Sequence, residues 1–268
     1  MKVIKDIGAS IRQRLLNLSK TDKRPFNEIL QYYAMEQFLY RLSQSHLADR
    51  FILKGALMLR VWQSSVYRPT MDIDMLGRSI LSEKKILAQF KDVISVPVEP
   101  DGLTFNPDTL HTESITEQNL YQGIRVRFIG YLTTAKINMQ IDIGFGDIVY
   151  PMPEKNELPT ILNLPAPKLL CYSRESAIAE KFEAVIKLGS LNSRMKDFYD
   201  IWLLSRQFCF ESFKLMEAIR LTFRQRQTEL NLPVDAFTPN FIHAKQEQWI
   251  AFYKRIRNDH IPLSFKTL

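Results

Sequence analysis

Two aspartates one residue apart, Asp72 and Asp74, are the first residues in this chain whose types and spacing could perform chemistry. On an extended segment, side chains two positions apart leave the same face, so both carboxylates project together. Met71, Ile73 and Met75 take the other face and are predicted to face a core. Neighbouring carboxylates repel, and burying them without partners is costly. A divalent cation such as Mg²⁺, which accepts carboxylate and phosphate oxygens, would relieve that repulsion. The alternative is a polar edge strand whose acids face water.

A third acid comes from a strand predicted further along the chain. Residues 137–145 alternate apolar and polar side chains, and Asp142 lies on the polar face. Residues 123–132 alternate in the same way, with Arg125 and Arg127 on the polar face. The two segments therefore predict strands, one of which would add a carboxylate to the first two.

The elements around these acids follow from periodicity and from turn residues. Residues 51–54 read as a short strand or a helix end, and Gly55 opens a helix. Prolines and a glycine divide residues 95–123, which predicts strand fragments and loops there. Helical patterns cover residues 6–22, 26–47, 56–63 and 82–94.

Two later helices carry charges at unexpected positions. On the helix predicted at 175–189, Lys181 lies at the edge of the apolar arc, while Glu180 and Glu183 lie opposite, where solvent is expected. Lys181 either extends its ammonium to water or reaches an anionic group in a cleft.

The helix predicted at 195–206 poses the same question with acids, because Asp197 and Asp200 share its packing side. Such acids need a basic partner, a helix N-terminus or a site, and the first helical turn already favours Asp197.

The chain divides into a mixed part and a helical part. Five prolines fall within residues 150–167, which marks an inter-domain connection with a short strand at Ile161-Leu162. Beyond it, helices are predicted over 175–189, 195–206, 211–228 and 243–258. The predicted domains are therefore residues 1–165, of mixed α/β structure, and residues 166–268, of all-α structure.

Composition indicates an ordinary globular protein, with 46% hydrophobic and 24% charged residues. No apolar run is long enough to cross a membrane, and no signal peptide is recognisable, so we expect no membrane partner. Cys171 and Cys209 are the only cysteines and lie in apolar surroundings. We expect both to be buried and unpaired in a reducing compartment, the cytoplasm, with neither a zinc site nor a disulfide framework.

The basic balance favours anionic partners. The net charge is +7 and the isoelectric point is near 9.3. Arg220, Arg224 and Arg226 fall on the helix predicted at 211–228 and would suit RNA phosphates, although a solvated helix face explains them equally well.

Three runs, in order and spacing, resemble the signatures of the AbiEii/AbiGii-type nucleotidyltransferase toxins. They are Phe51-Ile52-Leu53-Lys54-Gly55 with Tyr67-Arg68-Pro69-Thr70-Met71-Asp72-Ile73-Asp74, then residues 172–184, then residues 194–202. The resemblance extends over about residues 25–205. It implies an α+β fold of the nucleotidyltransferase superfamily, a mixed sheet flanked by helices and followed by an all-α C-terminal domain. It also implies a prokaryotic toxin or phage-defence protein controlled by a cognate antitoxin.

The resemblance assigns roles to individual residues. It implies a catalytic set of Asp72, Asp74, Asp142, Lys181 and Asp197, of which the first three would bind metal, Mg²⁺ or Mn²⁺. It implies a nucleotide-binding set of Lys54, Gly55, Ala56, Arg68, Thr70, Lys181 and Asp200. Ala56 departs from the superfamily pattern, in which serine or glycine usually follows the glycine. Only backbone N–H groups could then replace a serine hydroxyl at the phosphates.

The expected reaction is transfer of a nucleotide from an NTP to an acceptor, with pyrophosphate leaving. Two cations bridging the attacking and leaving oxygens require converging carboxylates, which the three aspartates would supply. The acceptor is expected to be an RNA, such as the acceptor end of a tRNA, or a protein. One alternative is a catalytically impaired protein that binds NTP or a partner, for which Ala56 is the only support. Another is transfer to a small molecule, which the +7 charge disfavours.

Overall fold

The computed structural model describes residues 6–64, 69–80, 82–117, 121–256 and 261–268. The chain forms two compact units. Unit 1 comprises the chain up to Gly146 together with Glu154–Cys171, and unit 2 comprises Asp147–Pro153 together with Tyr172–Leu268. Each unit is described by itself.

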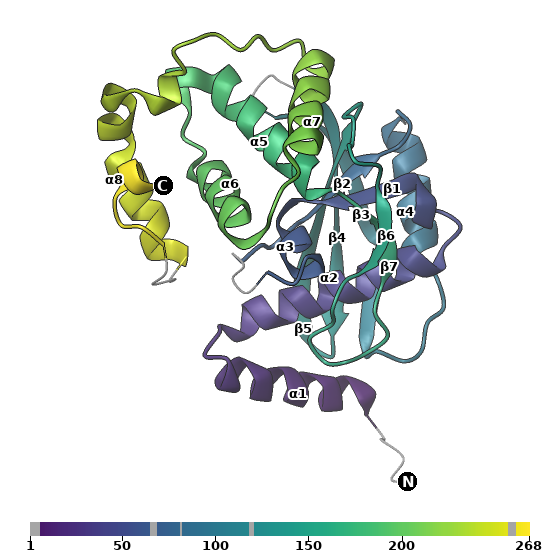
Figure 1. Ribbon diagram of the computed structural model, residues 1–268. Helices are drawn as coiled ribbons and strands as arrows, with labels where there is room; N and C mark the ends of the chain where they lie inside the picture. The colour runs from purple at the N-terminus through teal and green to yellow at the C-terminus, as the bar shows by residue number, and fades with distance from the viewer. Residues whose placement is uncertain (1–5, 65–68, 81, 118–120, 257–260) are drawn as a thin grey trace. The chain divides into compact units, whose positions relative to one another are not determined.

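Unit 1 is built on a mixed sheet (Figure 1). Its described strands are β1 (Phe51–Lys54), β2 (Ile73–Gly77), β3 (Leu103–Glu117), β4 (Tyr121–Leu132), β5 (Ala135–Phe145), β6 (Glu154–Glu157) and β7 (Lys168–Cys171). Their order in the sheet is β3-β4-β5-β2-β1-β7-β6. Strand β2 runs parallel to β5 and antiparallel to β1, and β1 runs parallel to β7. The strand that follows Asp72 therefore lies in the middle of the sheet. Ile73 and Met75 are buried as predicted, but Met71 precedes the strand and is exposed, so its prediction as a core residue is wrong.

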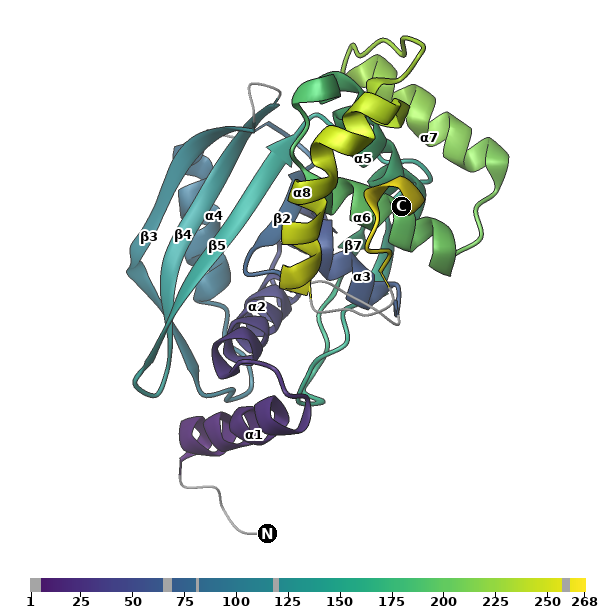
Figure 2. The same ribbon diagram turned by 90° about the vertical axis from the view of Figure 1, so that its left-hand side faces the viewer.

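Helices α2 (Phe26–Gln44) and α4 (Glu83–Ile94) pack on the sheet of unit 1, and α1 (Ile7–Thr21) packs on α2. Helix α3 (Met58–Val61) and the 3₁₀ turns η1 (Ala48–Arg50) and η2 (Gly55–Leu57) complete the unit. Figure 2 shows α4 behind β3, β4 and β5. Phe38 of α2 packs against Phe90 of α4 and Phe128 of β4, with ring centroids 5.7 and 5.6 Å away. Such aromatic clusters bury large areas, and they anchor α2 and α4 to the sheet.

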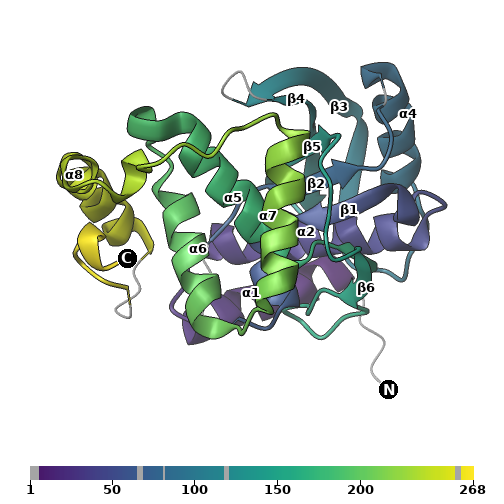
Figure 3. The ribbon, with the colours of Figure 1, turned by 45° about the horizontal axis from the view of Figure 1, so that its top comes forward.

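Unit 2 is helical (Figure 3). Its elements are α5 (Arg174–Leu188), α6 (Met195–Gln207), α7 (Ser212–Gln225), α8 (Pro239–Ile256) and the 3₁₀ turns η3 (Gly189–Leu191), η4 (Asp235–Phe237) and η5 (Phe265–Thr267). The Ser173 side chain caps α5 by accepting a hydrogen bond from the Ser176 N–H. Helix α5 packs against both α6 and α7. The predicted class, an α+β protein with an all-α C-terminal part, is confirmed.

The interpretation of residues 95–123 as fragments and loops is wrong. The segment contains one long strand, β3, in spite of Pro107. Its pairing with β4 is irregular between Asn106 and His111, and β3 is an edge strand. A proline is tolerated at an edge or a bulge because its missing N–H removes no ladder hydrogen bond there.

The proline-rich connection also differs from its prediction. Residues Ile161-Leu162 form a turn, whereas the strands on either side, β6 and β7, pair with each other. Because β7 joins β1, residues 168–171 belong to the sheet of unit 1. The chain therefore passes from one unit to the other after Gly146, Pro153 and Cys171.

The two cysteines have different surroundings. Cys171 is buried at the end of β7, and burial raises the pKa of its thiol to about 12. Cys209 is exposed after the end of α6, so the prediction that both thiols are buried is wrong. Among the described residues, no helix combines the length and apolar character required to cross a membrane.

Candidate active site

A row of five charged residues crosses the sheet of unit 1. Strand register places Asp142 of β5 opposite both Asp74 of β2 and Arg125 of β4. The row continues outward to Lys54 of β1 on one side and Glu113 of β3 on the other. Directly opposed residues project from the same face of a sheet. The two central acids are therefore flanked by a cation on each side.

The three predicted metal ligands come together. Asp72, Asp74 and Asp142 each offer a carboxylate oxygen, and these oxygens lie within 4.8 Å of one another. All three residues are half-buried, and the Thr70 hydroxyl donates a hydrogen bond to Oδ1 of Asp72. Hard divalent cations prefer such a set of carboxylate oxygens. The donor set fits Mg²⁺ or Mn²⁺.

Arg125 also belongs to this site, although none of the sequence motifs includes it. Its guanidinium donates two parallel hydrogen bonds to Asp142, from Nε to Oδ1 and from Nη2 to Oδ2, each 2.7 Å long. Hydrogen bonding to this carboxylate raises the pKa of Arg125. Fork-to-fork pairing of this kind fixes orientation as well as charge. In the sequence, the indication of such a role was that Arg125 lies on the basic face of the alternating segment 123–132.

The backbone approaches Asp74 closely at Gly55. This glycine has φ +74°, and a Cβ built on it would lie 2.0 Å from Oδ2 of Asp74. Only glycine adopts that conformation without strain and leaves room for the carboxylate. Gly55 begins the short turn η2, and Ala56 after it is buried. Arg68, predicted to bind nucleotide, lies outside the described residues.

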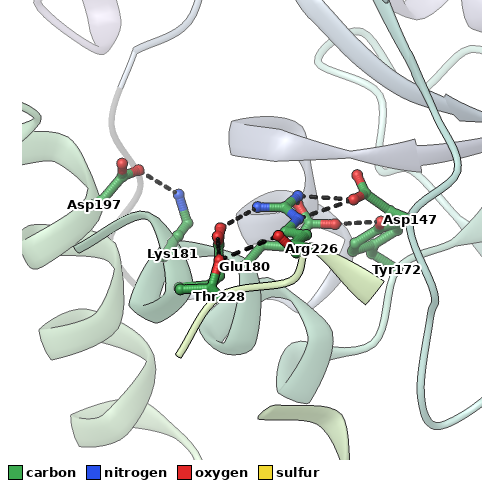
Figure 4. Close-up of polar contacts among 8 residues, drawn as sticks. Asp147, Tyr172, Glu180, Lys181, Asp197, Arg226 and Thr228 are labelled. Carbon is green, nitrogen blue, oxygen red and sulfur yellow. Dashed lines mark hydrogen bonds and ion pairs between the residues drawn. The ribbon is translucent and has the colours of Figure 1, made fainter. Parts of the chain in front are cut away.

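In unit 2, Lys181 is held between two buried acids. Its Nζ lies 3.1 Å from Oδ1 of Asp197 (Figure 4). The same Nζ lies 2.7 Å from Oδ2 of Asp200. Arg194 adds a second cation, with Nε 2.7 Å from Oδ2 of Asp197. The Asp197 side chain is only 1% exposed. The sequence predicted that Asp197 and Asp200 need basic partners. In the structure both acids pair with Lys181 of α5, and Asp197 also pairs with Arg194.

A second buried cluster surrounds Arg226. Its guanidinium contacts Asp147 at 2.9 Å (Figure 4). It also contacts Glu183 at 2.8 Å and Glu180 at 3.5 Å. Glu183 is completely buried and also accepts a hydrogen bond from the Thr228 hydroxyl. The prediction that Glu183 faces solvent is therefore wrong.

Arg226 is not available as part of an RNA-binding surface either, because its side chain is only 6% exposed. Of the other two arginines, Arg220 pairs with Glu217 on the surface of α7, and Arg224 is exposed.

A match to a protein-family model agrees with the resemblance found in the motifs. The family described as "Nucleotidyl transferase AbiEii toxin, Type IV TA system" matches residues 37–268. Among solved structures, JHP933 from Helicobacter pylori is 13% identical with a TM-score of 0.48, covering 88% of this chain and 86% of that one. A candidate nucleotidyltransferase from H. pylori is 14% identical with a TM-score of 0.44, covering 86% and 85%. No curated protein matches the sequence. From the family match over most of its length, the chain belongs to the AbiEii nucleotidyltransferase toxin family of type IV toxin–antitoxin systems.

Proposed function

We propose that this protein is a metal-dependent nucleotidyltransferase that transfers a nucleotide from an NTP to an RNA acceptor and releases pyrophosphate. The observation that carries the proposal is the cluster of Asp72, Asp74 and Asp142 on one sheet face, with their oxygens within 4.8 Å of one another. A cluster of three acids in a nucleotidyltransferase family is what this chemistry requires.

Within this site the acids would bind metal, and one of them would also accept a proton. Asp72, Asp74 and Asp142 would all hold Mg²⁺ or Mn²⁺, which would neutralise charge on the phosphates when bound. Asp142 would accept the proton of the acceptor hydroxyl, and Arg125 orients its carboxylate for that step. The hydroxyl oxygen forms a bond to the α-phosphorus as the bond from that phosphorus to pyrophosphate breaks.

The nucleotide-binding roles remain proposals from the family motifs. Lys54 and Gly55 lie beside Asp74 at the end of β1, where the phosphates of the NTP would meet the acids. Ala56 offers only its backbone. Thr70 would act indirectly, because its hydroxyl orients Asp72. For Lys181 we assign charge neutralisation on the triphosphate, with Asp197 and Asp200 positioning its ammonium.

The acceptor and the physiological partners are also part of the proposal. RNA suits the +7 net charge, and a tRNA acceptor end is the specific candidate. Membership of a toxin family implies a cognate antitoxin, and we extend the proposal to phage defence. The alternative of an impaired NTP-binding protein rests on Ala56, whereas the intact acidic cluster favours catalysis.

The direct test incubates the full chain with each labelled NTP, Mg²⁺ or Mn²⁺, and total cellular RNA, followed by identification of the labelled species. Transfer and pyrophosphate release should disappear with a chelator and fall by roughly 100-fold or more in Asp74→Asn. In addition, Mn²⁺ should raise the melting temperature of the wild type but not of Asp74→Asn. Full transfer by Asp74→Asn would exclude the proposed metal site. NTP binding without pyrophosphate release would support the impaired alternative.

A further inference from the structure

A pocket of about 420 Å³ opens in unit 1 beside Asp72. Its walls come from the first turns of α2, from the segment before β2, and from β4 and β5. Helix α2 packs against β5 (Figure 2). The volume falls within the range of about 300–1,000 Å³ that is typical of ligand sites. Because every wall belongs to unit 1, the pocket is a property of that unit alone.

The lining of the pocket combines two cations with side-chain amides. Arg127 donates a hydrogen bond to Gln140, 3.2 Å long, and pairs with Glu113 at 2.7 Å. Lys136 is exposed, and no described residue forms an ion pair or hydrogen bond with its ammonium. Gln31 is 5% exposed. Cations in a groove suit phosphate groups, and amides suit the hydrogen-bonding edges of unpaired bases.

One of these amides also builds the pocket wall. The Nε2 of Gln31 lies 3.1 Å from the carbonyl oxygens of both Met71 and Asn138. It thereby ties the segment before β2, which carries Asp72, to the adjoining part of β5. The wall beside the metal ligands is therefore fixed by a buried hydrogen-bonded side chain rather than by a loop.

Polar contacts connect the pocket to the acidic cluster. Gln140, which accepts from Arg127, places its Nε2 3.4 Å from Oδ2 of Asp142. Lys136, Gln140 and Asp142 share one face of β5 because they alternate along the strand. At about 3.3 Å per residue, Lys136 and Asp142 are roughly 20 Å apart along the strand, room for a few nucleotides of a single strand.

The pocket and the proposed site for the NTP phosphates lie on opposite sides of Asp74 in the sheet. Strand β2 lies between β1 and β5. Gly55 and Lys54, proposed for the donor phosphates, lie on the β1 side of Asp74, whereas the pocket lies on the β5 side. A molecule bound in the pocket therefore approaches the acids from the side that carries Asp142, the proposed acceptor of the hydroxyl proton.

We propose that this pocket binds the single-stranded 3′ end of the RNA acceptor, with Arg127 and Lys136 on its phosphates and its terminal hydroxyl at Asp142. The inference rests on the proposed function, because the hydroxyl at Asp142 has a role only in nucleotide transfer. Binding of the strand itself needs neither NTP nor metal.

The first test measures binding without NTP. The full chain is titrated into a short single-stranded RNA with a 5′ fluorescent label, and anisotropy is followed over a range of salt concentrations. The double variant Arg127→Ala/Lys136→Ala should bind at least about tenfold more weakly, and the slope of log K against log salt should fall by about 1.4 for two lost phosphate contacts. The matched control Lys84→Ala/Lys85→Ala removes two exposed charges from α4 and should change affinity by less than about twofold.

The second test measures transfer with the same variants. In the pocket variant KM for the RNA should rise, while the affinity for NTP with Mg²⁺, measured by calorimetry, should not change. An unchanged salt slope and an unchanged KM overturn the inference and leave the proposed function intact. Labelling of a protein acceptor that is insensitive to Arg127→Ala/Lys136→Ala also overturns it. If the wild type transfers nothing but binds the RNA through these two residues, the proposed function fails while the binding site stands.

Discussion

Arg125 binds both carboxylate oxygens of Asp142, with Nε 2.7 Å from Oδ1 and Nη2 2.7 Å from Oδ2. A proposed metal ligand thus already has an internal counter-charge, which relieves the repulsion among the three acids. The guanidinium has two effects at this position. It holds the Asp142 carboxylate in one orientation, and its positive charge repels a metal cation that binds to the same acids.

Replacing Arg125 by Met should separate these effects. Loss of a positive charge beside the cluster should tighten Mn²⁺ binding by roughly 3–10-fold, measured by calorimetry. Transfer should nevertheless slow, because Asp142 is no longer held in one orientation. Arg127→Met, on the same strand but paired with Glu113, is the control and should leave metal affinity unchanged. Weaker Mn²⁺ binding by Arg125→Met would contradict the idea that arginine and metal compete.

Gly55→Ala should damage both stability and activity. The added Cβ would collide with Asp74, and the positive φ would be strained, so the free energy of unfolding should fall by roughly 2–5 kcal/mol. Gly146→Ala is the matched control, since it has φ +87° but nothing within 4 Å of its Cβ, and it should lose only about 1–2 kcal/mol. If denaturant unfolding showed the same loss of free energy for Gly55→Ala and Gly146→Ala, the added contact with Asp74 would have no energetic cost.

The acidic cluster was partly predictable because it depends on local periodicity. Two-residue spacing is enough to place Asp72 and Asp74 on one face, and alternation is enough to place Asp142 on a polar face. The pairing of β2 with β5, which sets Asp74 opposite Asp142, depends on sheet order. Residue spacing does not encode that order, and only the family motifs linked the three acids.

The charge pairs of unit 2 were harder to predict from the sequence, because the paired residues come from segments far apart in the chain. A helical wheel treats the helix of Glu183 as isolated and therefore assigns its polar side to solvent. In the structure α7 packs on α5, and Arg226 just beyond α7 pairs with Glu183. Similarly, the alternating segment 123–132 predicted a basic face but not that Arg125 would bind Asp142.

Glu36 should make stability depend on pH. This carboxyl lies beneath Arg60, and burial raises its pKa from 4.5 to about 7 despite that cation. Between pH 4.5 and about 7 the folded protein then binds more protons than the unfolded chain, so the free energy of unfolding falls as pH rises through this window. The fall attributable to Glu36 is on the order of 3 kcal/mol and ends above the window.

Denaturant unfolding of Glu36→Gln against wild type at several pH values checks this dependence. The stability of the wild type relative to the variant should decrease from pH 4.5 to pH 7 and then stay constant. Arg60→Met should extend the decrease to higher pH, because Arg60 lowers the pKa of Glu36. A difference between wild type and Glu36→Gln that is independent of pH would refute the assignment.

Lys181→Met should destabilise the protein by about 3 kcal/mol, because it leaves Asp200 buried without this cation, whereas Asp197 keeps Arg194. The double variant Lys181→Met/Asp200→Asn should recover most of that loss in thermal unfolding. If Lys181 neutralises the triphosphate, the recovered protein should still be inactive. Recovery of transfer together with stability would show that Lys181 acts only in folding. Lys187→Met, exposed on the same helix, should change stability by less than about 0.5 kcal/mol.

Gly55 also bears on how genes for this protein can be inactivated. With φ +74° and Oδ2 of Asp74 only 2.0 Å from a would-be Cβ, the position accepts no side chain. A genetic selection for escape from activity should therefore recover substitutions at this chemically inert residue about as readily as at the acids themselves. Lineages that keep the activity should keep glycine here, while the next position, alanine in this chain, is free to vary among small residues because only its backbone is proposed to take part.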